Sequence, residues 1–422
     1  MTLADATAIP SRPVSALGDT SKVRGRDLRL DFFRGLAMFI ILMAHTPGNF
    51  LSLWIPARWG FSDATEIFVF CSGMASAIAF GSTFDRAGWL LGTARVCYRV
   101  WQVYWAHVGL FFATLAMAVY LTDLEITGRN YWGQLNLWMV FVESDQWENS
   151  NILLSFMTLR YVPNYFDILP MYMVVLCLMP VVMALAGLKP SRLNLGLVAA
   201  FVIITWLMAQ DTLLQSLGLG AYHLEFPAEP WSDRQWFFNP FAWQLIFFTG
   251  FSFMRGWLPK PPVATWLIVL AALIVIANVP LSNIGVRELG LDWAKDWRND
   301  YEALIDKSDF GILRYVHFLA LAYLAWVAAG DKGARLLTAG TGTLARVWEY
   351  LLAVILKVGQ QSLAVFVVSM FIARIMGFAM DVLGHGTITT LMVNLVGAAI
   401  LVATAYGAGW FKTQPWRAGR TG

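Results

Sequence analysis

Charged residues are scarce in this chain, and their scarcity excludes most classes of soluble globular protein. Only 14% of the 422 residues are Asp, Glu, Lys or Arg, whereas 58% are apolar and the mean hydropathy is +0.59. Such a composition is typical of a protein that crosses a membrane several times. The net charge is only +3, and we expect the lipid bilayer, and no nucleic acid, as a partner.

The usual signatures of metal, nucleotide and nucleophile sites are also missing from the sequence. The five histidines are dispersed without HxxxH or HExxH spacing, so we expect no metal. No Walker or GxGxxG loop is present, and Ser72-Gly73 lacks the GxSxG pattern of a nucleophile elbow. The cysteines lie in apolar surroundings without CxxC spacing, which predicts buried thiols at Cys71, Cys97 and Cys177.

Apolar runs that could span a bilayer predict an all-α membrane protein, a polytopic bundle of about ten transmembrane helices. The expected spans are 31–52, 62–83, 98–121, 168–187, 194–212, 239–256, 263–282, 310–329, 350–376 and 388–410. The run 132–142 is too short to span and predicts an interfacial or re-entrant helix. We expect a disordered cytoplasmic tail without a cleavable signal at 1–25, one transmembrane domain at 26–411 and a cytoplasmic tail at 412–422.

The charges between these spans predict the orientation of the chain. With the N-terminus in the cytoplasm, the inner segments hold 18 of the 30 Lys and Arg residues. The outer loops 122–167, 211–238 and 283–309 hold 17 acidic residues against seven basic ones. Because Lys and Arg accumulate on the cytoplasmic side, both termini are predicted inside and the three long loops outside.

Two ionisable residues in apolar runs are the first catalytic candidates. His45 lies near the end of the first span, just before Pro47-Gly48, and Glu66 lies near the start of the second. Ionisable groups inside spans are costly unless paired or hydrated, so they mark functional sites. If the two runs form a hairpin, both residues lie at a similar depth, where a carboxylate can orient a histidine as a general base. The alternative is a hydrogen-bonded pair that only joins two helices.

Basic and polar residues at the predicted cytoplasmic ends of the spans could bind an anionic ligand. Asp31 and Arg34 share a helical face, and Arg95 and Arg99 could clamp a polyphosphate or a nucleotide. Ser362 closes a polar patch at 359–362. The alternative is that these arginines only anchor helix ends and follow the positive-inside rule.

Polar residues near the predicted outer face could bind an acceptor or a developing oxyanion. Asn164 and Asp167 could bind sugar hydroxyls, although Asp167 could instead cap the following helix. Gln244 lies about five residues into a span, while Arg314 and His317 share one face of another. The outer loops also carry aromatic rings that suit carbohydrate stacking or form an interfacial belt: Trp132, Trp138, Trp147, Trp231, Trp236, Trp293 and Trp297.

Five sequence blocks resemble the OpgC family of bacterial inner-membrane succinyltransferases, which act on osmoregulated periplasmic glucans. The blocks are RLDFFRG at 29–35, HTPGN at 45–49, GFSDATEIFVF at 60–70, NYFDILPMY at 164–172 and GQQSLAVF at 359–366. The resemblance covers nearly the whole chain from about residue 26. It departs from the family pattern at Ala364, where the family tends to carry proline. A more distant similarity extends to the integral-membrane sugar O-acyltransferases.

The resemblance implies a multi-pass enzyme of the bacterial inner membrane that takes succinyl-CoA as co-substrate and a periplasmic beta-glucan oligosaccharide as acceptor. It implies that His45, oriented by Glu66, deprotonates a glucose hydroxyl. Further implied roles are phosphate binding by Arg34, Arg95 and Arg99, oxyanion stabilisation by Asn164, Gln244 or His317, and binding of the succinyl carboxylate by Arg314. Prior acylation of His45 and the formation of a homo-oligomer are left open.

Two functions without acyl transfer compete with this interpretation. Buried ionisable groups and broken helices also suit a secondary transporter, and tryptophan-rich outer loops suit a partner in glucan export. Neither alternative predicts hydrolysis or transfer from an acyl-CoA.

Overall fold

The computed structural model describes residues 27–141, 149–188, 191–338 and 340–416. Within these ranges the chain is helical, and an isolated β-bridge joins Pro227 to Gln235. The predicted all-α membrane fold is therefore confirmed. Five helical segments of the described chain are long and apolar enough to cross a membrane: Ala64–Asp123, Ile168–Gly187, Ile312–Ala329, Ser362–Leu383 and Thr387–Thr413. The count of ten spans and the orientation stay predictions.

Four helices form the part of the bundle that positions the site. They are α2 (Arg29–His45), α4 (Ala64–Ser76), α10 (Pro240–Arg255) and α15 (Thr343–Gln360), and α2 contacts both α4 and α15 while α4 packs on α10. Small residues allow these backbones to approach closely. A Cβ atom at Gly73 would lie 1.9 Å from the Phe247 carbonyl oxygen, and one at Gly35 would lie 2.1 Å from that of Ile355.

Three predicted boundaries change in the structure. Helix α2 ends at His45 and not near residue 52, because Pro47 cannot continue the backbone hydrogen-bond pattern. The expected spans 62–83 and 98–121 belong to one helical run, formed by α4, a π-helical turn η2 (Ala77–Gly81) and α5 (Ser82–Asp123). This run is interrupted at Gly88, whose φ of 81° is non-helical.

The expected span 350–376 is wrong as a single helix. The chain breaks at Gln361 between α15 and α16 (Ser362–Leu383), and α17 (Thr387–Thr413) follows. The last residues of α17 extend into the predicted tail 412–422, and the predicted tail 1–25 lies outside the described residues. The expected helix at 132–142 is also wrong, because short 3-10 turns occupy Gly133–Leu135 and Trp138–Val140.

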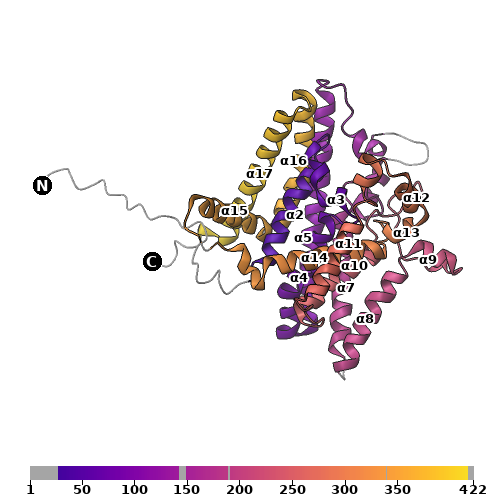
Figure 1. Cartoon of the computed structure of the whole chain (residues 1–422). Helices are drawn as coiled ribbons and strands as arrows, with labels where there is room; N and C mark the ends of the chain where they lie inside the picture. The colour runs from indigo at the N-terminus through magenta and orange to yellow at the C-terminus, as the bar shows by residue number, and fades with distance from the viewer. Residues whose placement is uncertain (1–26, 142–148, 189–190, 339, 417–422) are drawn as a thin grey trace.

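The remaining helices surround this core. They are α3 (Pro56–Trp59), α6 (Asn149–Met157), α7 (Ile168–Gly187), α8 (Ser191–Leu207), α9 (Asp211–Ser216), α11 (Thr265–Ala277), α12 (Asp292–Asp300), α13 (Glu302–Ile305) and α14 (Ile312–Ala329). Figure 1 shows α9, α12 and α13 together on one side of the bundle, opposite α15. We call the two ends of α2 the Arg34 end and the His45 end.

Candidate active site

A cavity of about 400 Å³ opens at the His45 end of α2. Its walls come from α2, the segment between α2 and α4, the start of α4, the segment before α7, the connections before α10, after α11 and before α14, and α16. The polar residues that line it are His45, Ser52, Arg58, Asp63, Thr65, Tyr165, Asp167, Asn283 and Lys307. Of the sequence-predicted site residues, the lining therefore includes His45 and Asp167.

His45 owes its orientation to the end of its own helix. Its Nδ1 lies 2.8 Å from the carbonyl oxygen of Ile41. Because a carbonyl oxygen can only accept, Nδ1 carries the hydrogen and donates it, and Nε2 is left with the lone pair. The side chain therefore has the tautomer that a general base needs.

The same helix end is held by two further side chains. Thr46 Oγ1 donates to the Leu42 carbonyl oxygen at 2.8 Å, and Asn49 Nδ2 donates to that of Met43 at 3.2 Å. Terminal carbonyls of a helix lack partners within the helix, so these contacts satisfy groups that the break at Pro47 leaves open. The result is a rigid support for His45.

Glu66 does not orient His45 in this structure, which corrects the predicted pair. The Glu66 carboxylate is fully buried, and its Oε1 accepts from Arg314 Nη2 at 2.7 Å and Nε at 2.9 Å. Its Oε2 accepts from the backbone N–H of Asp63 at 2.8 Å, in a capping box at the start of α4. The physical reason is the cap, because a glutamate at this third helical position turns back toward the N-terminus of its helix.

Asp63 lies between two cations at the cavity wall. Its Oδ2 accepts from the Lys307 ammonium at 2.5 Å and lies 4.0 Å from Arg314 Nη2. Burial alone would raise the pKa of Asp63, but the positive charges of Lys307 and Arg314 outweigh it and hold that pKa well below its usual range. Sequence reasoning missed Lys307, because it lies 244 residues from Asp63 along the chain.

Tyr165 packs against His45 and also contacts residues of α16. The two rings meet edge to face with centroids 5.5 Å apart, and the Arg374 guanidinium lies 4.2 Å from the Tyr165 ring centroid. The Tyr165 hydroxyl donates to the Met370 carbonyl oxygen at 2.5 Å. Tyr165 has a φ of 87°, which is rare for a residue other than glycine and is typical of strain held at a functional site.

Asp167 is a second acid of the cavity. Its side chain makes no capping hydrogen bond to α7, so the capping role considered from the sequence is not supported. Its Oδ1 is buried and, within the described chain, has no hydrogen-bond partner. Burial raises the pKa of Asp167, which precedes α7, to about 7.

The other predicted acceptor residues do not line the cavity. Asn164 Oδ1 accepts from Arg234 at 2.8 Å, and Gln244 Nε2 donates to the Val202 carbonyl oxygen at 2.7 Å. His317 Nδ1 lies 2.7 Å from Ser62 Oγ, directly behind the start of α4. Together with Arg314, these side chains hold neighbouring segments in place.

Basic residues gather at the opposite end of α2. Arg34 donates to Ser362 Oγ, and its buried Nε has no partner among the described residues. The structure thus brings these two residues together, and their binding of a donor stays a prediction. Lys412 lies within electrostatic range of Arg34, Arg99 and Lys357. We call Arg34, Arg99, Lys357 and Lys412 the basic cluster. Arg95 is turned elsewhere and donates to Thr83 Oγ1 at 2.6 Å.

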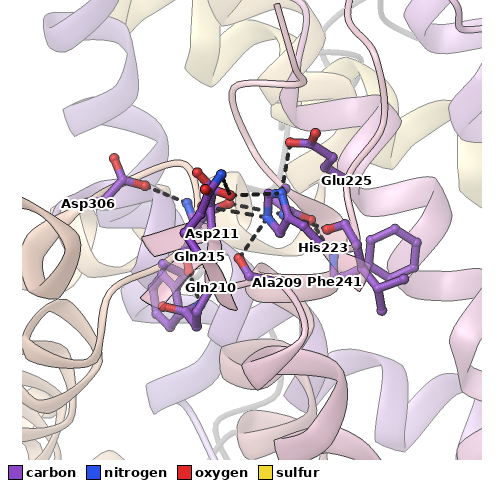
Figure 2. Close-up of polar contacts among 12 residues, drawn as sticks. Ala209, Gln210, Asp211, Gln215, His223, Glu225, Phe241 and Asp306 are labelled. Atoms are coloured by element: carbon purple, nitrogen blue, oxygen red, sulfur yellow. Dashed lines mark hydrogen bonds and ion pairs between the residues drawn. The ribbon is translucent and has the colours of Figure 1, made fainter. Parts of the chain in front are cut away.

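A third polar group, around His223, lies outside the cavity lining (Figure 2). His223 Nδ1 lies 3.2 Å from Glu225 and 3.8 Å from Asp211, and its Nε2 lies 3.8 Å from Asp309. Asp309 also accepts from Asn239, the cap residue of α10, at 3.0 Å. These contacts tie α9 to the starts of α10 and α14, which is a structural role.

Comparison with known proteins agrees with the architecture and with the sequence blocks. No curated protein and no solved structure matches the chain. The family described as OpgC protein matches residues 26–413, which is most of the chain. The chain therefore belongs to the OpgC family, and this membership indicates an acyltransferase of the OpgC type.

Proposed function

We propose that this protein transfers a succinyl group from succinyl-CoA to glucose hydroxyls of a periplasmic glucan in the bacterial inner membrane. The observation that carries the proposal is the position of His45, a histidine with a basic Nε2 at the wall of a 400 Å³ cavity. A transporter does not require a histidine in this tautomer, whereas acyl transfer to a hydroxyl does.

The length of α2 suits a donor that reaches in from the other end. Positions 34 and 45 are eleven residues apart on one helix, which corresponds to roughly 16 Å. An extended pantetheine arm has about the backbone length of four to five residues and spans on the order of 15 Å. A coenzyme held at Arg34 can therefore place its thioester near His45.

The basic cluster supplies the charges that a nucleotide with three phosphates needs. Arg34, Arg99, Lys357 and Lys412 come from α2, α5, α15 and α17, so four helices share the contact. Guanidinium and ammonium groups bind phosphate oxygens through charge-assisted hydrogen bonds. In the proposed orientation this end faces the cytoplasm, where the acyl-CoA is present.

The reaction then follows from the tautomer of His45. Its Nε2 takes the proton of the sugar hydroxyl while the hydroxyl oxygen attacks the thioester carbonyl carbon. The carbon–sulfur bond breaks, and the imidazolium returns the proton to the departing thiolate of coenzyme A. Lys307 lines the same cavity and is the donor that we place at the developing oxyanion, in the position first expected for Gln244 or His317.

Aromatic side chains border the side from which the sugar would enter. Trp54 and Trp59 flank the lining residues Ile55, Ala57 and Arg58, and their ring centroids are 6.0 Å apart. Trp54 is 72% exposed, and Trp59 is fixed by a hydrogen bond from its Nε1 to the Leu53 carbonyl oxygen. Exposed rings beside the cavity suit stacking against glucose units.

The test is transfer of labelled succinyl from succinyl-CoA to glucan by the purified protein. His45→Ala should reduce transfer by about 10²–10⁴-fold, the usual contribution of a general base. His385→Ala is the matched control, because His385 is half-exposed, bound to Asp381, and outside the cavity lining. Absence of transfer by the wild type with any acyl-CoA would favour the transporter or export alternatives, and full activity of a folded His45→Ala variant would remove the base assignment.

A further inference from the structure

Arg58 is a cation of the cavity wall without an acidic partner. It lies in α3, is partly buried, and lines the cavity together with His45. Lys307 and Arg314 are bound to Asp63 and Glu66, whereas Arg58 makes no ion pair or side-chain hydrogen bond with any residue that the structure describes. A guanidinium left unpaired beside a cavity is a candidate for binding an anion.

The backbone around Arg58 is held firmly, so the position of its side chain does not depend on a loose loop. Helix α3 begins with Pro56, and the Gly60 N–H donates to the Pro56 carbonyl oxygen at 3.2 Å. Asn283 Nδ2 donates to the Ala57 carbonyl oxygen at 3.3 Å, which joins α3 to the segment after α11. The preceding Ile55 is buried. The segment is therefore anchored on both sides of Arg58.

The charges around the cavity leave Arg58 in excess. Asp63 is compensated by Lys307, by Arg314 and by the N-terminus of α4, whose Thr65 N–H donates to it at 2.6 Å. Glu66 is compensated by Arg314, and Asp167, the other acid of the lining, makes no ion pair with Arg58. Burial raises the pKa of Asp167 to about 7, which favours its uncharged form below that pH. A ligand that brings a carboxylate into the cavity therefore meets one uncompensated guanidinium, whose planar fork matches a carboxylate with two parallel hydrogen bonds.

We infer that Arg58 binds the free carboxylate of the acyl group and makes the cavity selective for a dicarboxylic acyl chain over an acetyl group. This inference rests on the proposed function and names the residue that sets the acyl specificity. It replaces Arg314, which the sequence suggested for this role. Arg314 is 8% exposed, and both Nε and Nη2 are bound to Glu66, so it presents no group to the cavity.

The test compares succinyl-CoA and acetyl-CoA as donors for the wild type, Arg58→Met and Arg58→Lys. Loss of a charge-assisted contact should lower kcat/KM for succinyl transfer by about 10–100-fold in Arg58→Met. Acetyl transfer should change less than about threefold, because an acetyl group has no carboxylate to bind. Arg58→Lys should lose less succinyl transfer than Arg58→Met, since it keeps the charge but not the fork.

Arg287→Met is the matched control, because Arg287 is exposed and does not line the cavity. It should leave the ratio of succinyl to acetyl transfer unchanged. An equal loss with both donors, or no loss with either, in folded Arg58→Met protein would overturn the inference.

A binding measurement separates this inference from the proposed function. Thioether analogues of succinyl-CoA and acetyl-CoA, which cannot transfer, are titrated by calorimetry into the wild type and Arg58→Met. The wild type should bind the succinyl analogue more tightly, and Arg58→Met should lose that preference. A wild type that transfers neither acyl group contradicts the proposed function, whereas equal binding of both analogues contradicts the role of Arg58.

Discussion

The two ends of α2 differ in how their charges are compensated. At the His45 end, the carboxylates of Asp63 and Glu66 each face a cation from outside their own helix. At the Arg34 end, Lys412 lies within electrostatic range of Arg34, Arg99 and Lys357, and the buried carboxylate of Asp31 lies on the same helix as Arg34. Two carboxylates near the cavity are thus paired with cations while Arg58 is left over, whereas the basic cluster holds four cations beside Asp31, an arrangement that attracts a polyanion. Under the proposed function, α2 joins the acceptor site to the donor site, and its two ends differ in their charges.

The largest effect on the His45 end should come from breaking a buried ion pair. Glu66→Gln removes the nearer anion of buried Arg314 and leaves Asp63 at 4.0 Å, which should cost about 3 kcal/mol of stability. Because the Ile41 carbonyl orients His45, transfer per folded molecule should be largely kept. The measurement is thermal unfolding in detergent beside transfer activity. The matched control is Glu302→Gln at the exposed start of α13, which should change neither quantity.

The opposite result would mean that Glu66 assists the base His45 and does not only stabilise the fold around the cavity. If Glu66→Gln unfolds like the wild type but loses transfer, the carboxylate acts on His45 and not only on Arg314.

A smaller effect is expected when the donor end loses one cation. Arg34→Met should raise KM for succinyl-CoA by about tenfold, because one charge-assisted contact to phosphate is lost. The kcat should stay near the wild-type value, and KM should depend less on salt. Arg346→Met, an exposed change on α15, is the control. A fall in kcat at unchanged KM would move Arg34 away from coenzyme binding.

A separate effect is the pH dependence of stability contributed by Asp167. Its pKa is raised by burial to about 7 in the folded protein, whereas an unfolded chain releases this proton near pH 4. Between these values the folded state holds more protons, so stability falls as pH rises from about 4 to 7 and does not change further above that range. Asp167→Asn should lose this part of the pH dependence, as followed by melting temperature from pH 5 to 8.

Asp233→Asn, an exposed change in the segment before α10, should keep the dependence seen in the wild type. Parallel melting curves for the wild type and Asp167→Asn would show that Asp167 remains ionised in the folded protein.

Local sequence patterns determined the helical class, the position of His45 beside a helix break, and the placement of Arg34 and Ser362 at helix ends. These features depend on apolar runs and on residues close to helix ends, whose effects act within one or two turns. The break at Pro47-Gly48 marks the end of α2, and that end supplies the carbonyl that sets the tautomer of His45.

The partners of the ionisable groups were decided by tertiary structure alone. Glu66 has the residue type and the depth to face His45, yet it pairs with Arg314, which lies 248 residues further along the chain. Lys307 and Arg58 line the cavity from segments that connect the long helices. The composition of these segments does not predict where in the fold their side chains lie. The physical reason is that a buried charge takes whichever opposite charge the packing of distant helices brings within reach, and a single sequence does not encode that distance locally.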